Sequence, residues 1–209
     1  MFGNSSSSLN KKNTHKPKPQ SGFGLVELMV SISIMVLVSA IMLTNQSSFN
    51  GSILLRSQAY EIALQLREIQ LSAVSASSNG SGDFHSVLGV HFDSTSANNN
   101  IYNIFKDSSS GSNSNGFYDS GEAFGIQGIV DRRFEIREIR AIGTDTISGY
   151  AVSVVFERPN FDARFFDSSG ELTNTSSIEI DIARRGVTGV GVGVLRTVEI
   201  TSAGQIAVQ

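Results

Sequence analysis

The fold of this chain is decided by one stretch, Ser21-Gly-Phe-Gly-Leu-Val-Glu-Leu-Met-Val-Ser-Ile-Ser-Ile-Met-Val-Leu-Val-Ser-Ala-Ile-Met-Leu43. It is apolar over the length of a membrane span, since about 20 apolar residues cross the hydrocarbon core as a helix. Its single charged residue is Glu27. A carboxylate in such a run costs about 2.5–3.5 kcal/mol on insertion scales, so we expect Glu27 to have a function and a partner.

Three ordinary interpretations compete for this segment. A secretory signal peptide has a shorter apolar core that ends at a small-residue cleavage site, and it has no reason to carry Glu27. A plain membrane anchor explains the length and the preceding lysines but leaves the carboxylate unexplained. A buried helix of a soluble domain rarely contains so long an apolar run.

The three residues Gly22, Phe23 and Glu27 resemble the class III signal of type IV pilins and type II secretion pseudopilins. The resemblance implies that residues 1–22 are a leader peptide, which a prepilin peptidase removes by cutting between Gly22 and Phe23. It also implies N-methylation of Phe23, the first mature residue. Glu27, the fifth mature residue, is then expected to pair with the Phe23 amine of a neighbouring subunit during assembly. Such a pair supplies the opposite charge that a buried carboxylate needs.

The charges around the span predict its orientation. Lys11, Lys12, Lys16 and Lys18 precede it, and no Lys or Arg follows it before Arg56. Positive charge beside a span is retained in the cytoplasm. We therefore expect a single-pass protein of the plasma (inner) membrane, spanning at about 23–43, with its C-terminal domain outside the cytoplasm. The family resemblance adds a later place in a surface or periplasmic filament (fimbrium).

The helix is predicted to continue beyond the membrane. From Phe49 to Ala73, apolar residues recur at steps of three and four with charged residues between them, which is typical of an amphipathic helix. The patch Asn45–Gly51 is a weak point, because Asn and Gly are poor helix formers. The prediction is one long helix over residues 23–77, with a membrane half and an amphipathic half.

Residues 78–209 are predicted to form a β-rich domain, with a loop insertion at about 94–131. Short runs of alternating or continuous apolar residues, bounded by turn residues, indicate strands. They lie at 86–92, 101–105, 134–142, 150–157, 178–182, 197–201 and 206–208. One long helix followed by such strands predicts an α+β fold, in which the helix packs on an antiparallel β-sheet. This is the architecture of the pilin fold.

The C-terminal part is most similar to H-type minor pseudopilins and related minor pilins. Val155-Phe156 and Pro159, the arginine-containing Ser177–Arg185, and the closing Arg196–Ala207 with its Ala-Gly turn carry this resemblance. In those proteins a strand, an arginine-rich strand and a closing hairpin end the chain.

The composition limits the partners. Without the leader, 12 basic residues remain against 19 acidic ones. An acidic mature chain argues against broad binding of nucleic acid or of anionic membranes. There is no cysteine, so the disulfide of many pilins is absent and the redox compartment stays open.

One loop has the spacing of a calcium site. Calcium loops place oxygen ligands at positions 1, 3, 5, 7, 9 and 12 with Gly at position 6. Counting from Gly111, which lacks the expected carboxylate at position 1, Gly116 falls at position 6. The predicted ligands are Asn113, Asn115, the Phe117 carbonyl, Asp119 and Glu122, with Asp107 as a replacement at position 1. The alternative is an ordinary Asn/Ser/Gly surface loop, and no cofactor is required otherwise.

Three further features indicate no catalytic or nucleotide site. The glycines of 187–194 lack a following helix pattern, so they do not form a dinucleotide fingerprint. His85 and His91 are too few for zinc. Arg132, Arg133, Arg137 and Arg140 could contact DNA phosphate, but Glu135 and Glu138 between them favour a paired strand face.

The sequence thus predicts a non-enzymatic structural subunit of a type IV filament or of a type II secretion pseudopilus. Its partners would be other pilin or pseudopilin subunits, the prepilin peptidase and the inner-membrane assembly platform. Two alternatives stay open: a DNA-capturing minor pilin of a competence filament, and a singly anchored surface protein.

Overall fold

The computed structural model describes residues 22, 24–75, 87–107, 115–156, 161–189, 191 and 193–209, with the backbone alone for 44–49. The chain divides into two compact units, Met1–Thr44 and Asn45–Gln209. The helix α1, Leu25–Val74, contributes residues to both units. The weak patch at 45–51 is helical, and the described helix ends three residues before the predicted boundary at 77.

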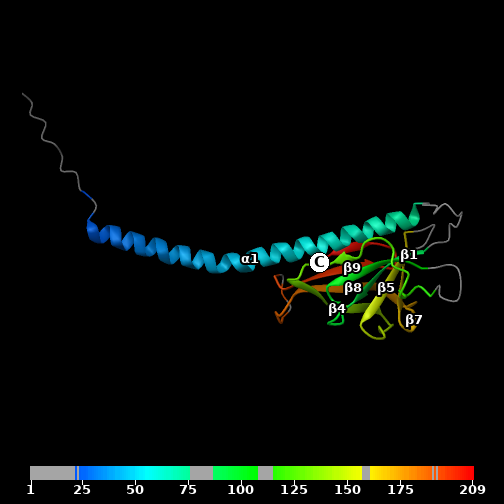
Figure 1. The fold of residues 1–209 in the computed structure, drawn as a ribbon. Coiled ribbons are helices and arrows are strands. Elements are labelled where there is room, and N and C mark those ends of the chain that lie inside the picture. Colours follow the sequence, from blue (N-terminus) through cyan, green and yellow to red (C-terminus); the bar gives the residue numbers. More distant parts are fainter. Residues whose placement is uncertain are drawn as a thin grey trace, which may run out of the picture. The chain divides into compact units, whose positions relative to one another are not determined.

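The second unit is an α+β domain in which the C-terminal part of α1 packs on antiparallel sheets (Figure 1). This confirms the predicted fold class. The strands are β1 Val87–Asp93, β2 Ile101–Asp107, β3 Gly128–Ile129, β4 Phe134–Gly143, β5 Ala151–Phe156, β6 Ala163–Asp167, β7 Gly170–Glu171, β8 Thr175–Arg184, β9 Leu195–Thr201 and β10 Ile206–Val208.

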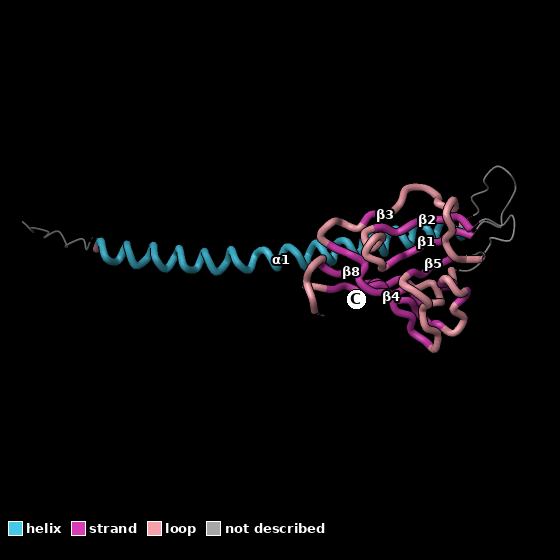
Figure 2. The backbone as a smooth tube through the Cα atoms, turned by 60° about the horizontal axis from the view of Figure 1, so that its bottom comes forward, coloured by secondary structure: helices cyan, strands magenta, loops and turns pink. Residues whose placement is uncertain are grey.

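The strands form two sheets, a division that the strand patterns in the sequence did not predict. One sheet has the order β3-β2-β1-β5-β6-β7 and the other the order β10-β9-β8-β4. Figure 2 shows β3, β2, β1 and β5 of the first sheet side by side. The alternation of apolar residues tells which face of a strand is buried, but not which distant strand lies beside it. Three strands were missed: β3 and β7 have two residues each, and β6 is a five-residue run.

The described part of the predicted insertion at 94–131 is built into the first sheet. β2 pairs with β1 along all but its first residue, Val87↔Asp107 through Phe92↔Tyr102. Farther along the insertion, Ala123 forms a bridge to Phe105. Tyr102 and Phe105 are buried. This segment therefore supplies side chains to the core, and its strand β3 forms an edge of the first sheet.

The core forms around one stripe of α1. The buried residues of this stripe recur at helical spacing: Leu55, Ala59, Ile62, Ala63, Leu66, Ile69 and Ala73. They share one cluster with side chains from both sheets, including Val90 and Val154 of the first and Ile180 and Val198 of the second. Burying such a stripe is the main stabilising term for an amphipathic helix.

Glutamine and arginine side chains fix the position of α1 on the sheets. The Gln70 amide donates to the carbonyl oxygens of Phe161, at 2.8 Å, and of Gly204, at 2.9 Å. Arg67 donates to the Ile206 carbonyl at 2.8 Å. Tyr102 of β2 donates to the side-chain oxygen of Gln65. Because directional contacts reach both sheets, the helix has a defined register on the apolar core.

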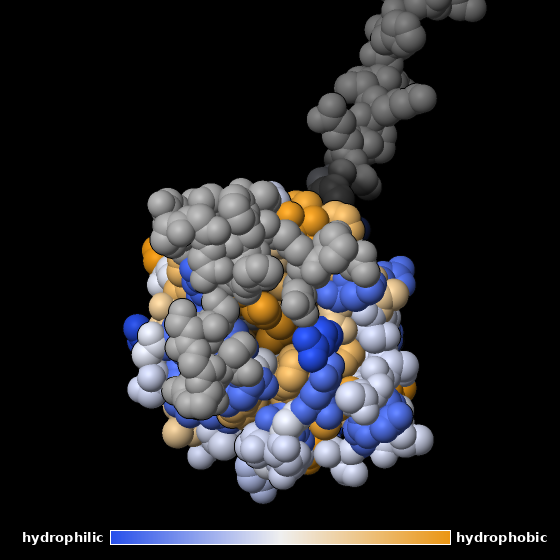
Figure 3. Space-filling model, turned by 90° about the vertical axis from the view of Figure 1, so that its right-hand side faces the viewer, coloured by the Kyte–Doolittle hydropathy of each residue, from blue (hydrophilic) through white to orange (hydrophobic). Residues whose placement is uncertain are grey.

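Figure 3 shows the face of the domain that lies at the right in Figure 1. Hydrophilic residues are spread over the coloured part of this face, with hydrophobic areas between them. This surface suits water, unlike residues 25–43, whose large apolar side chains are exposed along α1.

The packing of α1 predicts that two leucines, two residues apart, contribute very differently to the free energy of unfolding. Leu66 is 0% exposed and Leu64 is 66% exposed. Leu66→Ala should lower the free energy of unfolding by about 2–5 kcal/mol, because it leaves a cavity between α1 and the sheets. Leu64→Ala should change it by less than about 0.5 kcal/mol. Chemical unfolding of the full chain in neutral detergent measures both, and equal losses would contradict the packing described here.

Candidate functional site

The N-terminal end of α1 carries the predicted processing site. Gly22 is exposed, and neither Gly22 nor Gly24 has another part of the chain within 4 Å of a side-chain position. Phe23 lies outside the described residues. The first helical residue, Leu25, follows Gly22 by three positions.

Glu27 lies in the first turn of α1. The turn is closed by the Leu28 N–H, which donates to the Gly24 carbonyl at 3.2 Å. The Glu27 side chain is exposed, and it makes no ion pair within the part of the chain that the structure describes. A carboxylate in the first turn is favoured by the partial positive charge of the helix N-terminus.

The segment Leu25–Leu43 is long and apolar enough to cross a membrane. Its 19 residues extend about 28 Å as a helix, close to the thickness of the hydrocarbon core. The hydroxyls of Ser31 and Ser33 each donate to the carbonyl four residues earlier, at 2.8 Å. These internal bonds satisfy polar groups that lipid could not.

The comparison with protein families finds the prokaryotic N-terminal methylation motif at residues 17–43. This motif places the chain in the type IV pilin and pseudopilin superfamily. No curated protein and no solved structure matches the chain significantly. A pilin-family chain is a structural protein and not an enzyme. The family implies processing by a prepilin peptidase and assembly with other pilins, and the apolar helix is consistent with anchoring in the inner membrane before assembly.

The predicted calcium loop is held by its own hydrogen bonds. The Asn115 amide donates to the Asp119 carboxylate at 3.1 Å, and the Asn115 oxygen accepts from the Phe117 N–H at 2.8 Å. The Glu122 carboxylate accepts from the Asp119 N–H at 3.0 Å. The structure thus brings Asn115, Asp119 and Glu122 together, while Asn113 lies outside the described residues.

Asp107 faces the same loop from the end of β2. It is 3% exposed, and its carboxylate accepts from the Gly116 N–H at 2.8 Å. Gly116 has φ +75°, and a side-chain carbon there would lie 2.5 Å from the Phe166 ring. The glycine at position 6 is therefore required by the packing of this turn, with or without an ion.

Among the described residues, no group of three or more His, Cys, Asp or Glu side chains is arranged to hold a metal. A calcium ion at 111–122 would have to use the amide oxygens and the Phe117 carbonyl. It would also compete with the backbone N–H groups that now occupy Asn115 and Glu122. Calcium binding here stays a prediction.

His91 is buried and belongs to the packing of the first sheet. Its Nδ1 lies 3.0 Å from the Ser153 hydroxyl, and its ring contacts Phe117 edge-on. Burial lowers the pKa of His91 to about 4, partly opposed by Asp93. The imidazole is neutral at pH 7 and serves as a core residue. His85 lies outside the described part of the chain.

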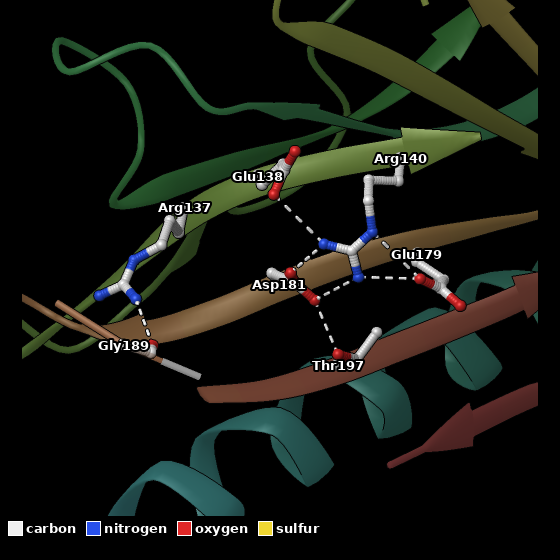
Figure 4. A network of polar contacts seen from close by, with 7 residues as sticks. All are labelled: Arg137, Glu138, Arg140, Glu179, Asp181, Gly189 and Thr197. Atoms are coloured by element: carbon white, nitrogen blue, oxygen red, sulfur yellow. Dashed lines mark hydrogen bonds and ion pairs between the residues drawn. The ribbon is translucent and has the colours of Figure 1, made fainter. Parts of the chain in front are cut away.

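Two of the strand arginines are engaged within the domain (Figure 4). Arg140 of β4 pairs with Glu179 at 2.8 Å and with Asp181, which is 3% exposed. The bonds with Asp181 raise the pKa of Arg140. Arg137 donates to the carbonyl oxygens of Val187, at 2.6 Å, and Gly189, at 3.3 Å. The expectation of a paired strand face is confirmed for Arg140, which also pairs with Glu138 at 3.3 Å, whereas Arg137 bonds to carbonyl oxygens instead.

The glycine-rich stretch is a connection between strands. β8 ends at Arg184, β9 begins at Leu195, and Arg137 holds the intervening loop through carbonyl oxygens. No helix follows, so the described residues have no phosphate-binding fingerprint.

The calcium prediction has a direct test. If the loop binds the ion only in the folded state, calcium should raise the stability of the full chain in neutral detergent by RT ln(1 + [L]/Kd), or about 2.7 kcal/mol at about a hundred times Kd. Glu122→Gln should abolish most of the gain. It removes the charge but keeps an acceptor for the Asp119 N–H, so the calcium-free melt should hardly move. Gly111→Asp should tighten binding by adding a carboxylate. If millimolar calcium does not shift the melting curve, the segment is an ordinary surface loop that binds no calcium.

Proposed function

We propose that this protein is a subunit of a type IV filament or a type II secretion pseudopilus and that it functions as an H-type minor pseudopilin or related minor pilin. In this proposal the prepilin peptidase cuts between Gly22 and Phe23 and methylates the Phe23 amine. The mature chain then enters the filament from the inner membrane through the assembly platform.

The observation that carries the proposal is a single carboxylate at the start of a membrane-spanning helix, with no cationic partner among the residues that the structure describes. Glu27 stands in the first turn of an apolar segment of spanning length. An α-amine has an ordinary pKa near 8, so the new N-terminus is a cation at neutral pH. A second subunit that presents its N-terminus would neutralise Glu27 inside the apolar layer. Assembly is then favoured by the removal of an unpaired charge from lipid.

The end of the chain supports the narrower assignment to the H-type group. β8 ends in Arg184, and β9 and β10 form a closing hairpin with the register Ile206↔Ile200 and Val208↔Val198. The turn between them contains Gly204, with φ +77°, where a side-chain carbon would lie 1.8 Å from the Phe161 carbonyl oxygen. A strand, an arginine-bearing strand and a hairpin around an Ala-Gly turn are the features expected of that group.

Processing can be read from the mass of the membrane-extracted protein. The mature chain should start at Phe23 and carry one additional methyl group. Gly22→Leu should leave the precursor uncut, because a bulky side chain replaces the exposed glycine before the bond, whereas Gly24→Ala on the other side of Phe23 should be cut. A native chain that starts at Met1, or one cut near Ala40, would contradict the proposal.

Glu27→Gln should separate assembly from folding. The variant keeps the size and polarity of the side chain but cannot attract an amine. It should be processed and held in the membrane, and it should be depleted from sheared filaments by about tenfold or more, since lost charge pairs of this kind cost at least about 1.4 kcal/mol. The matched control is Glu68→Gln, which removes an exposed carboxylate from the same helix outside the span. Normal incorporation of Glu27→Gln would refute a role for this charge.

A further inference from the structure

A pocket lined by arginines lies where the domain begins on α1. It has a volume of about 560 Å³ and takes Gly51 and Leu54 from α1, Arg132 and Arg133 from the turn before β4, and Arg184 and Arg185 from the end of β8. These three segments are far apart in the sequence, so the cluster is formed only by the fold.

The charge of the pocket is only partly balanced. Arg133 pairs with Asp131 at 2.9 Å, and Arg185 lies 3.7 Å from the Glu135 carboxylate. Arg132 and Arg184 form no salt bridge among the residues that the structure describes, although the neighbouring Asp131 carboxylate also interacts electrostatically with Arg132. Four guanidinium groups thus face the carboxylates of Asp131 and Glu135, and the excess of positive charge in one concavity makes a site for an anion.

Gly51 makes room for one of these cations. A side-chain carbon at this position would lie 3.0 Å from the guanidinium carbon of Arg184. Glycine inside a helix costs about 1 kcal/mol relative to alanine. Here it lets the guanidinium lie against the helix backbone, at the wall of the pocket.

The chain path brings the pocket near a membrane. Gly51 follows Leu43, the last residue of the candidate span, by eight residues. Eight residues reach at most about 28 Å when fully extended. The pocket is therefore within that distance of the surface at which the span leaves the hydrocarbon core, whatever the arrangement of the two units.

We propose that this pocket binds the phosphate group of an anionic phospholipid from the membrane in which α1 is anchored. The guanidinium fork matches phosphate oxygens with two parallel hydrogen bonds. Leu54, 37% exposed, offers an apolar surface beside the phosphate for the glycerol end of the lipid. The contact holds the domain at the membrane surface before the subunit is drawn into a filament.

A nucleic acid fits the same arginines less well. Duplex binding relies on a row of phosphate contacts along an extended surface. In this domain the neighbouring arginines of β4, Arg137 and Arg140, are occupied by backbone carbonyls and by carboxylates. A concave site with an excess of positive charge suits one phosphate group.

The test titrates the full chain, held in neutral detergent, with short-chain phosphatidylglycerol and measures Kd by a fluorescence or thermophoresis signal. Parallel titrations use short-chain phosphatidylcholine, inorganic phosphate and a duplex oligonucleotide. Phosphatidylglycerol should bind most tightly, and its affinity should fall as salt rises. One basic residue near an anionic surface contributes about fivefold, so Arg132→Gln with Arg184→Gln should weaken binding roughly twenty-five-fold.

A charge-matched control separates the pocket from general attraction. Lys106→Gln with Arg164→Gln removes two positive charges from β2 and β6, outside the pocket, and should change Kd less than about twofold. Arg132→Lys with Arg184→Lys should retain part of the binding, because the charge remains while the fork is lost. Melting curves confirm that each variant is folded.

Four outcomes would overturn the proposal: equal affinity for phosphatidylcholine, equal affinity for inorganic phosphate, tighter binding of the duplex with the same arginine dependence, or an equal loss in the control. None of them bears on filament assembly, which is measured through the processing of Gly22–Phe23 and the incorporation of Glu27 variants.

Discussion

The structure depends on one helix whose first part is suited to lipid and whose second part is suited to an aqueous domain. Residues 25–43 of α1 are apolar on every side and exposed, as a segment in lipid requires, and their serine hydroxyls bond to the helix itself. From Leu55 onward the buried apolar residues occupy one stripe. A stripe of that kind is stable in water only when something covers it, and the two sheets of the domain do so. The rest of the domain is arranged around this requirement.

Covering one helix with two sheets places polar side chains at the boundary between them. Gln65 accepts from Tyr102 of the first sheet, while Gln70 donates to the carbonyls of Phe161 and Gly204. Gln70 is 8% exposed, so an unmade bond there would leave a polar group buried without compensation. These contacts fix the position of the helix where apolar packing alone would tolerate sliding.

The arginines of the domain divide into two groups, according to whether they pair with carboxylates on neighbouring strands. On the surface of β4 and β8, Arg140 neutralises the buried Asp181 and the neighbouring Glu179, and Thr197 of β9 also donates to Asp181, at 2.7 Å. Those charges stabilise strand pairing. At the ends of the strands, beside Gly51, Arg132 and Arg184 lie in a pocket where neither forms a salt bridge among the described residues. A domain in an acidic mature chain thus presents a local positive site close to where the chain leaves its span.

The sequence alone determined the helix, the processing motif and most of the strands. Apolar periodicity is a local property, so a span at about 23–43, an amphipathic helix from Phe49 to Ala73 and strands such as 134–142 and 197–201 were predicted from residue order. The exact stripe was not, because the predicted member Ile53 is exposed and the buried stripe begins at Leu55. The signal formed by Gly22, Phe23 and Glu27 also lies within a few residues of sequence, and the family comparison found the N-terminal methylation motif at residues 17–43. Only the tertiary structure decided the division into two sheets, the place of β6 between β5 and β7, and the pocket that joins Gly51 to Arg132 and Arg184. These features depend on which distant segments lie side by side. The alternation of apolar residues in a strand indicates its buried face but does not identify the strand that pairs with it.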